Sequence, residues 1–145
     1  MRKTIVYLAI ISLVLFTISS CTKDEVVDPN NPLVGLWSVE KDTYKEGNRD
    51  LETTFYDEPS SYFIQIKSKG DWIEEEGYLG QEPIVRTYQY ELIGNDSILC
   101  YTRVPSDGFK MRYELNGLEM ILTEKGYKEV SGVNIPYTYV RYLYK

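Results

Sequence analysis

The sequence predicts an all-β domain, a small single-domain up-and-down antiparallel meander that closes into an eight-stranded β-barrel. After residue 33, apolar side chains recur at alternate positions, and no stretch keeps a helical apolar period. Gly, Asn, Asp and Pro bound these segments, and short loops join most of them. With about eight strands, closure of the sheet removes both exposed edges and leaves an interior for side chains or one small ligand.

The chain begins with a segment that is typical of a secretory signal. A short basic head precedes an almost unbroken apolar run over 5–16, and the sequence Ile-Ser-Ser-Cys follows at 18–21. These last four positions resemble the lipobox of bacterial lipoproteins, which implies cleavage after residue 20 and attachment of acyl chains such as palmitate to Cys21. The apolar run is shorter than the ~20 residues that span a bilayer. An uncleaved anchor and an ordinary secretory signal are the alternatives.

Residues 21–33 are predicted to form a flexible tether between the lipid and the domain. Acids, asparagines and prolines follow Cys21, and such a composition cannot bury an apolar face. Two or more acyl chains on the cysteine would hold the chain stably on a membrane. Lys23-Asp24-Glu25 resembles the surface-export tag of some Gram-negative lipoproteins. We therefore expect an outer-membrane lipoprotein exposed on the cell surface, with the periplasmic face as the alternative.

Composition narrows the classes of function. The chain has 16 basic and 22 acidic residues, and loss of residues 1–20 removes two basic residues and no acid, which leaves a net charge of −8. Such an acidic surface disfavours nucleic acid as a partner. The chain has no histidine, the commonest general base and transition-metal ligand. Cys100 is the only cysteine besides Cys21, so no disulfide within the chain is expected.

The predicted domain spans 34–145. Its expected strands are 34–41, 62–68, 72–78, 84–93, 97–104, 109–115, 118–124 and 137–144, with a possible short strand at 51–56. The exception to short connections is the segment 42–61, which is rich in charged and turn-forming residues. A long loop in a compact domain is usually functional or mobile, so we expect this segment to lie over the barrel opening as a lid.

A hairpin is expected at Asn116-Gly117, where turn chemistry and burial pattern agree. A two-residue loop at these positions opposes Leu115 to Leu118. Apolar side chains of both strands then share one face, and charged side chains share the other. The pattern therefore predicts one inward and one outward face for this hairpin.

The turn at 68–71 leaves two registers open. One register pairs Ile66 with Ile73, and the neighbouring register pairs Ile66 with Trp72. A slip of one residue turns every side chain of a strand to the opposite face of the sheet. The two registers therefore bury different residues, and the sequence does not choose between them.

Tyrosines are the leading clue to function, since the chain has 14 of them. A loop at Asn95-Asp96 would pair Tyr90 with Tyr101 and turn both side chains inward. The tyrosines that we expect to bind a ligand are Tyr88, Tyr90, Tyr101, Tyr113 and Tyr139. A tyrosine combines an apolar ring with a hydrogen-bonding tip, which suits a cavity for a small apolar or amphipathic molecule. Core filling by the same tyrosines is the alternative.

Two segments at the ends of the domain carry a resemblance to a known family. Gly35-Leu36-Trp37 lies at the start of the first expected strand, and Arg141 lies in the last one. This arrangement in an eight-stranded meander resembles the lipocalin superfamily, and more specifically the compact lipocalin-like domains of bacterial lipoproteins. The resemblance implies that Gly35 and Trp37 form a plug at the closed end of the barrel and that Arg141 packs across the indole. A cation over an indole ring is a favourable contact.

No set of residues predicts an enzyme, a metal site or a cofactor. Glu74-Glu75-Glu76 is the densest acidic run, but a strand would place Glu75 on the face opposite the other two. Calcium takes six to eight oxygen ligands, more than such a pair provides. A pair of carboxylates could hydrolyse glycosides, but no motif selects one. Cys100 has no histidine partner to activate it as a nucleophile.

The sequence thus predicts a membrane-anchored lipoprotein whose lipocalin-like domain binds a small apolar or amphipathic ligand. The alternative is a non-catalytic cell-envelope protein that contacts a protein or a glycan through the surface of its barrel. A cavity of roughly 300 Å³ or more beneath 42–61 is expected for the first function.

Overall fold

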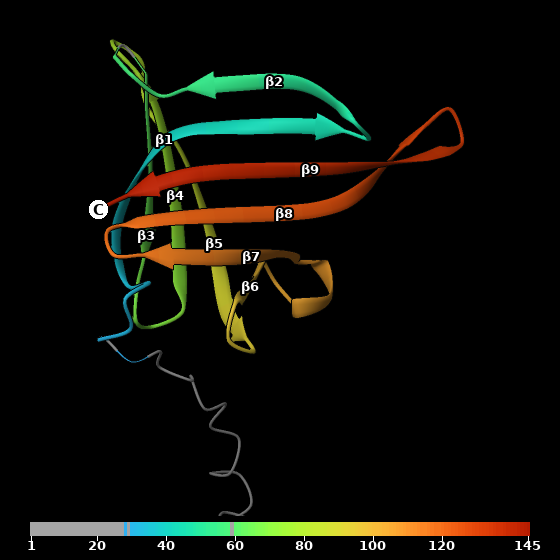
Figure 1. Cartoon of the computed structure of the whole chain (residues 1–145). Helices are drawn as coiled ribbons and strands as arrows, with labels where there is room; N and C mark the ends of the chain where they lie inside the picture. The colour runs from blue at the N-terminus through green and yellow to red at the C-terminus, as the bar shows by residue number, and fades with distance from the viewer. Residues whose placement is uncertain (1–27, 29, 59) are drawn as a thin grey trace, which may run out of the picture.

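The computed structural model describes residues 28, 30–58 and 60–145, so the predicted signal, Cys21 and most of the tether lie outside the described residues. The described chain is a closed antiparallel barrel of eight strands with one additional strand, as Figure 1 shows. The strands are β1 Gly35–Glu46, β2 Arg49–Phe55, β3 Ser60–Ile66, β4 Asp71–Tyr78, β5 Ile84–Ile93, β6 Ser97–Tyr101, β7 Phe109–Asn116, β8 Glu119–Val130 and β9 Val133–Tyr144. The predicted all-β, eight-stranded barrel is confirmed. Among these residues, no helix has the length and apolar character that crossing a membrane would require.

Strand order follows the order of the chain. Strands β3 to β8 each pair with the next, and β9 returns to pair with β1, which closes the barrel. The other edge of β1 pairs with β3 over Gly35–Ser38 and then with β2 over Lys41–Glu46. Strand β2 is therefore the one additional strand, and it continues the barrel wall on one side.

The segment 42–61 is not a loop, so the predicted lid is wrong. Strand β1 continues through it to Glu46, the chain turns at Gly47-Asn48, and β2 returns antiparallel to β1. Gly47 has φ 57°, a value that glycine adopts without strain in a tight turn. The optional strand expected at 51–56 corresponds to β2.

The last hairpin is also longer than expected. Strands β8 and β9 include the stretch 125–136, and they turn at Ser131-Gly132, where φ is 53° and 79°. Positive φ at both central residues is typical of a type I′ turn, whose twist matches that of the flanking strands. Figure 1 shows the tip of this hairpin projecting past the other strands.

The hairpin expected at Asn116-Gly117 is present with a different loop. The two loop residues are Gly117 and Leu118, with φ 63° at Gly117, and Leu115 pairs with Met120 rather than with Leu118. A glycine with positive φ at the first central position is typical of a type II′ turn. The shift is two residues, so the faces are unchanged and the predicted inward side chains still point inward.

The register of the β5–β6 hairpin differs from the predicted one by one residue. This shift has a larger effect than the two-residue shift at Gly117. Its loop is Gly94-Asn95-Asp96, so Tyr90 pairs with Cys100 instead of Tyr101. A slip of one residue turns β6 over, so Cys100 is buried and Tyr101 points outward, where its hydroxyl donates to Glu91 Oε1 at 2.8 Å. The prediction that Tyr101 lines the interior is therefore wrong.

The turn between β3 and β4 selects one of the two registers that the sequence left open. Ile66 pairs with Trp72, and the turn consists of 67–70. This register places Trp72 and Glu74 on the inward face of β4, and both are buried. Glu75 points outward and is exposed.

A β-bulge in β1 changes which of its residues point inward. The register against β9 shifts between Val39 and Lys41, so Glu40 is the extra residue. Trp37 and Val39 point inward before the bulge, and Asp42 points inward after it. The bulge therefore moves the inward positions of β1 from odd to even residue numbers.

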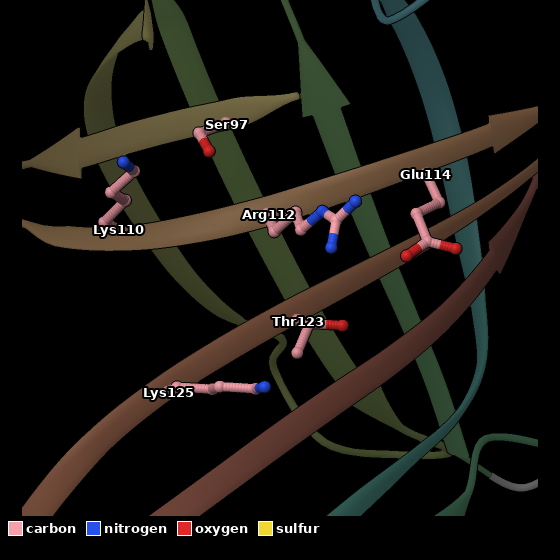
Figure 2. A pocket seen from close by; sticks show the side chains of 6 residues that line it. All are labelled: Ser97, Lys110, Arg112, Glu114, Thr123 and Lys125. Atoms are coloured by element: carbon pink, nitrogen blue, oxygen red, sulfur yellow. The ribbon is translucent and has the colours of Figure 1, made fainter. Parts of the chain in front are cut away.

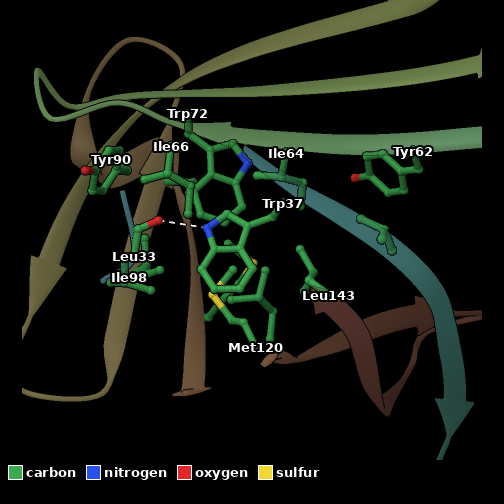
Figure 3. Close-up of a cluster of buried hydrophobic side chains, with 14 residues drawn as sticks. Leu33, Trp37, Tyr62, Ile64, Ile66, Trp72, Tyr90, Ile98, Met120 and Leu143 are labelled. Carbon is green, nitrogen blue, oxygen red and sulfur yellow. Dashed lines mark hydrogen bonds between the residues drawn. The ribbon is translucent and has the colours of Figure 1, made fainter. Parts of the chain in front are cut away.

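The interior has an apolar half and a polar half. The apolar half surrounds Trp37 at the end where the chain enters the domain (Figure 3). Its buried residues are Leu33, Trp37, Val39, Ile64, Ile66, Trp72, Tyr90, Ile98, Cys100, Met111, Met120, Leu122 and Leu143. Burial of one large apolar side chain contributes ~1.5–3 kcal/mol, so this half supplies most of the stability.

Beyond this level, inward side chains become polar on several strands at once. The change runs from Val39 to Asp42 on β1, from Trp72 to Glu74 on β4, from Leu122 to Glu124 on β8 and from Leu143 to Arg141 on β9. Because the change occurs at the same level around the barrel, it defines one polar end opposite the apolar one. We call the apolar end the closed end.

Candidate functional site

Trp37 fills the closed end of the barrel. Its indole is fully buried, and its Nε1 donates to the carbonyl of Leu33 at 2.8 Å, the dashed line in Figure 3. Lys145 Nζ lies 4.7 Å from the centroid of the indole ring and donates to the carbonyls of Pro32 at 2.7 Å and Val34 at 3.0 Å. The C-terminal lysine thus joins the end of β9 to the segment through which the chain enters the domain.

Gly35 provides the space that Lys145 occupies. It has φ 145°, and a Cβ at this position would lie 3.0 Å from Lys145 Cε. A larger residue would therefore be strained in its backbone and would also press on the lysine. The residue stands beside Trp37 at the closed end.

The predicted contact between Arg141 and the indole is wrong. Ser38 pairs with Tyr144, so the register places Lys145 beside Trp37, whereas Arg141 pairs with Asp42 beyond the bulge. The Arg141 guanidinium lies instead 4.9 Å from the ring centroid of Tyr139 and 5.6 Å from that of Tyr62. Arg141 therefore belongs to the polar end of the barrel.

Replacement of Lys145 by methionine should lower the free energy of unfolding by about 1 kcal/mol, because it removes a cation–π contact and two hydrogen bonds. Urea denaturation followed by tryptophan fluorescence would measure the change. Lys125→Met, on the exposed outer face of β8, is the matched control and should change stability by less than about 0.5 kcal/mol. Equal effects of the two changes would contradict the role of Lys145 over the indole.

The deepest polar residues form a buried ion pair. Glu74 Oε1 accepts from Arg141 Nη1 at 2.6 Å and from Trp72 Nε1 at 3.0 Å. Burial alone would lower the pKa of Arg141, but the Glu74 carboxylate raises it overall, so the guanidinium stays charged. Within the part of the chain that the structure describes, the buried N–H of Arg141 Nε has no acceptor. An unpaired buried donor costs ~1–3 kcal/mol, so this position is unfavourable for stability.

A second buried carboxylate lies beside the ion pair. Asp42 Oδ2 accepts a hydrogen bond from the Tyr56 hydroxyl at 2.7 Å and another from the Tyr139 hydroxyl. Burial and the Asp42 carboxylate raise the pKa of Tyr56. Burial likewise raises the pKa of Tyr139, although the Arg141 charge opposes it. Tyr56 also packs edge-on against Tyr62, with ring centroids 5.1 Å apart.

The outermost inward side chains repeat the pairing of a tyrosine with a carboxylate. Tyr44 donates to Glu46 Oε1 at 3.0 Å, and Tyr137 donates to Glu124 Oε1 at 2.6 Å. The hydrogen bond to Glu124, together with burial, raises the pKa of Tyr137 to about 12. Lys128 Nζ also donates to Glu46 Oε1, at 3.0 Å. The rings of Tyr44 and Tyr137 lie 5.9 Å apart and are tilted by 33°.

These side chains form one continuous inner surface, which we call the polar face. Its residues include Asp42, Tyr44, Glu46, Tyr56, Tyr62, Glu74, Glu124, Lys128, Tyr137, Tyr139 and Arg141. The polar face presents aromatic rings next to charged and hydrogen-bonding groups, which is the composition of a site for an amphipathic small molecule. Over the described residues, no three His, Cys, Asp or Glu side chains are placed to hold a metal ion.

Of the five tyrosines predicted to bind a ligand, Tyr139 lies in the polar face. Tyr90 is buried in the apolar half, where its hydroxyl donates to the carbonyl of Lys67 at 2.9 Å. This contact fixes the β3–β4 turn, so Tyr90 acts as a core residue. Tyr101 lies on the outer face of β6, as described above.

The other two predicted tyrosines lie at the edge of the core. Tyr88 packs edge-on against Phe109, with ring centroids 5.4 Å apart and planes at 90°. Tyr113 is half-buried, and its hydroxyl donates to the carbonyl of Asn95 at 2.9 Å. Both side chains therefore support loops and neighbouring strands, and neither contacts the polar face in the interactions described above.

Sequence reasoning missed Asp42, Tyr44 and Tyr56 because they fall within the segment expected to be a lid. The alternation of Asp42, Tyr44 and Glu46 is a period-two pattern that could have extended the first strand. The bulge at Glu40 hides this pattern, because these residues are out of phase with Trp37.

Two grooves lie on the outside of the barrel. The first has a volume of about 410 Å³ over β6, β7 and β8, and Figure 2 shows its lining side chains, Ser97, Lys110, Arg112, Glu114, Thr123 and Lys125. Arg112 Nε pairs with Asp96 Oδ2 at 3.0 Å beside it. The second has a volume of about 630 Å³ and is lined by Glu58, Ser60, Ser61, Glu75, Gly77, Tyr78, Leu79, Gln81 and Pro83. Neither groove is the internal cavity that was expected beneath 42–61.

The polar face is therefore the candidate functional site, and its geometry is the basis for assigning a function. Its cluster of buried charge, tyrosine hydroxyls and aromatic rings is the main departure from a simple apolar core. Comparison with known proteins adds no identity, because no protein-family model matches this chain and no match was found among curated proteins.

Proposed function

We propose that this chain is a membrane-anchored lipoprotein whose barrel binds a small amphipathic ligand at the polar face. The observation that carries the proposal is the placement of a buried ion pair and a buried Asp42 where an apolar core could have continued. Buried ion pairs usually stabilise a fold no better than apolar residues of similar volume. Departures from the rules of core packing are expected at functional sites. The orphan N–H of Arg141 is the sharpest of these departures.

The division of the interior limits where a ligand can bind. Side chains fill the apolar half, and 11 of them are almost completely inaccessible to solvent. A ligand would therefore contact the polar face, where Tyr44, Tyr137 and Tyr139 are only half-buried. Rings that alternate with carboxylates suit a molecule that has both apolar and polar parts, so an amphipathic ligand fits better than a purely apolar one.

The predicted anchor and the fold together give the site an orientation. The chain enters the domain next to Leu33, at the closed end of the barrel. A lipid on Cys21 and a tether that spans at most about 40 Å would hold this end toward the membrane. The polar face would then point away from the outer membrane, toward the surroundings of the cell in a surface-exposed lipoprotein.

The binding function predicts a bound molecule in protein purified from its own membrane. Native mass spectrometry should detect a small-molecule adduct on the wild-type lipoprotein. Tyr139→Leu should weaken retention about tenfold, because it removes a ring and a hydroxyl from the centre of the polar face. Tyr101→Leu is the matched control, since Tyr101 lies on the outer face, and it should retain the adduct. Absence of an adduct, or equal retention by both variants, would overturn the proposal.

The two outer grooves support one alternative, a non-catalytic cell-envelope protein that contacts a protein or a glycan. Tyr78 and Leu79, which line the second groove, are 46% and 85% exposed and offer apolar area for such a contact. Under this alternative the purified lipoprotein would carry no small molecule, and crosslinking in intact cells would capture the same envelope component with the wild type and with Tyr139→Leu.

A further inference from the structure

The polar face carries more negative than positive charge. Arg141 neutralises Glu74 at 2.6 Å, and Lys128 neutralises Glu46 at 3.0 Å. Two other acids of the face, Asp42 and Glu124, form no salt bridge within the described part of the chain. Tyrosine hydroxyls hydrogen-bond to these two carboxylates but do not cancel their charge. Two negative charges therefore remain, one at the middle of the face and one nearer its outer end.

The hydrogen-bond directions make the same surface rich in acceptors. The hydroxyls of Tyr44, Tyr56, Tyr137 and Tyr139 all donate to carboxylates of the face. Their protons are thus committed, and the oxygen lone pairs that remain can only accept. A ligand with N–H or O–H donors or a positive charge fits this surface, whereas a carboxylate would meet repulsion.

The outer part of the face is built so that a tyrosine ring lies close against the sheet. Tyr137 pairs with Gly126, and a Cβ on Gly126 would lie 2.7 Å from two ring carbons and the hydroxyl oxygen of Tyr137. The absence of a side chain at this position lets the ring lie against the backbone of β8. Strand β7 pairs with β8 only as far as Glu124, so in the described residues this part of β8 is not paired on that edge. The ring stays half-buried and accessible at the outer end of the face.

Lys128 already places an ammonium group at the outer end of the polar face, beside Glu46. Lys128 Nζ bonds to the Glu46 oxygen that also accepts from Tyr44. Glu124 has the equivalent tyrosine partner, Tyr137, but no cation within the described residues. The two tyrosine–carboxylate pairs are therefore alike, except that the cation of the second pair is missing.

We propose that the ligand bound by this lipoprotein is a cationic amphiphile, an organic ammonium compound whose charged head lies against Tyr137 and Tyr44 and pairs with Glu124. The inference rests on the proposed binding function and specifies its ligand class. Aromatic rings attract cations through their electron-rich faces, and an adjacent carboxylate adds Coulomb attraction. The buried N–H of Arg141 Nε lies at the deep end of the same face. A ligand that reached it would need a hydrogen-bond acceptor there.

Three probes of equal chain length would test the charge of the ligand. Hexyltrimethylammonium, hexanoate and 1-hexanol would each be titrated calorimetrically into the full lipidated chain in lipid nanodiscs, with empty nanodiscs subtracted. We expect the ammonium probe to bind about tenfold more tightly than hexanoate. This preference should weaken as salt screens the charge of Glu124.

Two variants would locate the binding site. Glu124→Gln should weaken binding of the ammonium probe about fivefold and leave 1-hexanol unchanged. Gly126→Val keeps every charge but displaces the Tyr137 ring, so it should weaken the ammonium probe as well. Glu114→Gln, on the outer face of β7, is the matched control and should bind like the wild type. Circular dichroism would establish that each variant is folded.

The outcomes separate this inference from the proposed function. Equal binding of all three probes, or tighter binding of hexanoate, would overturn the cationic ligand and leave a binding function in place. Binding of none of the probes, together with no adduct in native mass spectrometry, would overturn the binding function itself. An ammonium preference that Glu124→Gln and Glu114→Gln reduce equally would overturn the assignment to the polar face.

Discussion

Replacement of Glu74 by glutamine is expected to lower the free energy of unfolding by about 3–5 kcal/mol, because it leaves the buried Arg141 guanidinium without its counter-charge. The two side chains are 4% and 11% exposed, so water cannot replace the lost carboxylate oxygen. Glutamine has nearly the same volume, and the loss therefore reports charge rather than a cavity. Urea denaturation monitored by tryptophan fluorescence would measure it.

A control and a rescue make this prediction specific to the ion pair. Glu75→Gln changes the adjacent residue, which is exposed on the outer face, and should change stability by less than about 0.5 kcal/mol. The double variant Glu74→Leu, Arg141→Met removes both charges and should recover most of the stability. A Glu74→Gln protein as stable as the wild type would show that Arg141 is not held by this charge.

Alkaline pH is expected to unfold the barrel because several tyrosines keep their protons only in the folded state. Burial raises the pKa of Tyr56, Tyr62 and Tyr139, and it raises that of Tyr90 to about 12, from an ordinary value of 10.0. The unfolded chain therefore releases protons near pH 10 that the folded chain still holds. The stability that these protonated tyrosines contribute is fully present below pH 10. It is lost as the pH rises through their pKa values in the folded state.

The slope of this loss can be assigned to particular residues. Tyr62 is 5% exposed, and it should remove ~1.4 kcal/mol of stability for each pH unit above 10. Thermal unfolding followed by circular dichroism from about pH 8 upward would give the slope. Tyr62→Phe should reduce the slope, whereas Tyr144→Phe, on the exposed outer face, should leave it unchanged. A melting temperature that is constant across this range would show that the buried tyrosines ionise without cost to the fold.

The fold could be predicted from the sequence because period-two segments and turn residues act locally. The Asn116-Gly117 hairpin shows both the strength and the limit of this reasoning. Its two strands and their faces were predicted, but the loop moved to Gly117 and Leu118, because glycine alone adopts the positive φ at the first central position without strain. An error of two residues is harmless, whereas the one-residue error at the β5–β6 loop turned Tyr101 outward.

The polar face could not be predicted in the same way, because distant residues form it. Asp42 and Tyr139 hydrogen-bond across 97 positions of sequence, and Arg141 reaches Glu74 across 67. Such contacts depend on the register that closes the barrel between β1 and β9. The bulge at Glu40 sets this register, and an unpaired extra residue leaves no clear mark in a hydrophobic pattern.

The same bulge lets the wall of the barrel gain or lose one residue without reversing the charge of its lining. On β1, acidic and aromatic residues alternate with Lys41, Thr43 and Lys45, which now face outward. Deletion of Glu40 would remove the extra residue and bring the two phases of the strand into line, so that Asp42 and Tyr44 would still face inward and these lysines outward. A lineage could thus gain or lose one codon at this point of the wall and keep the electrostatic preference of its binding chamber.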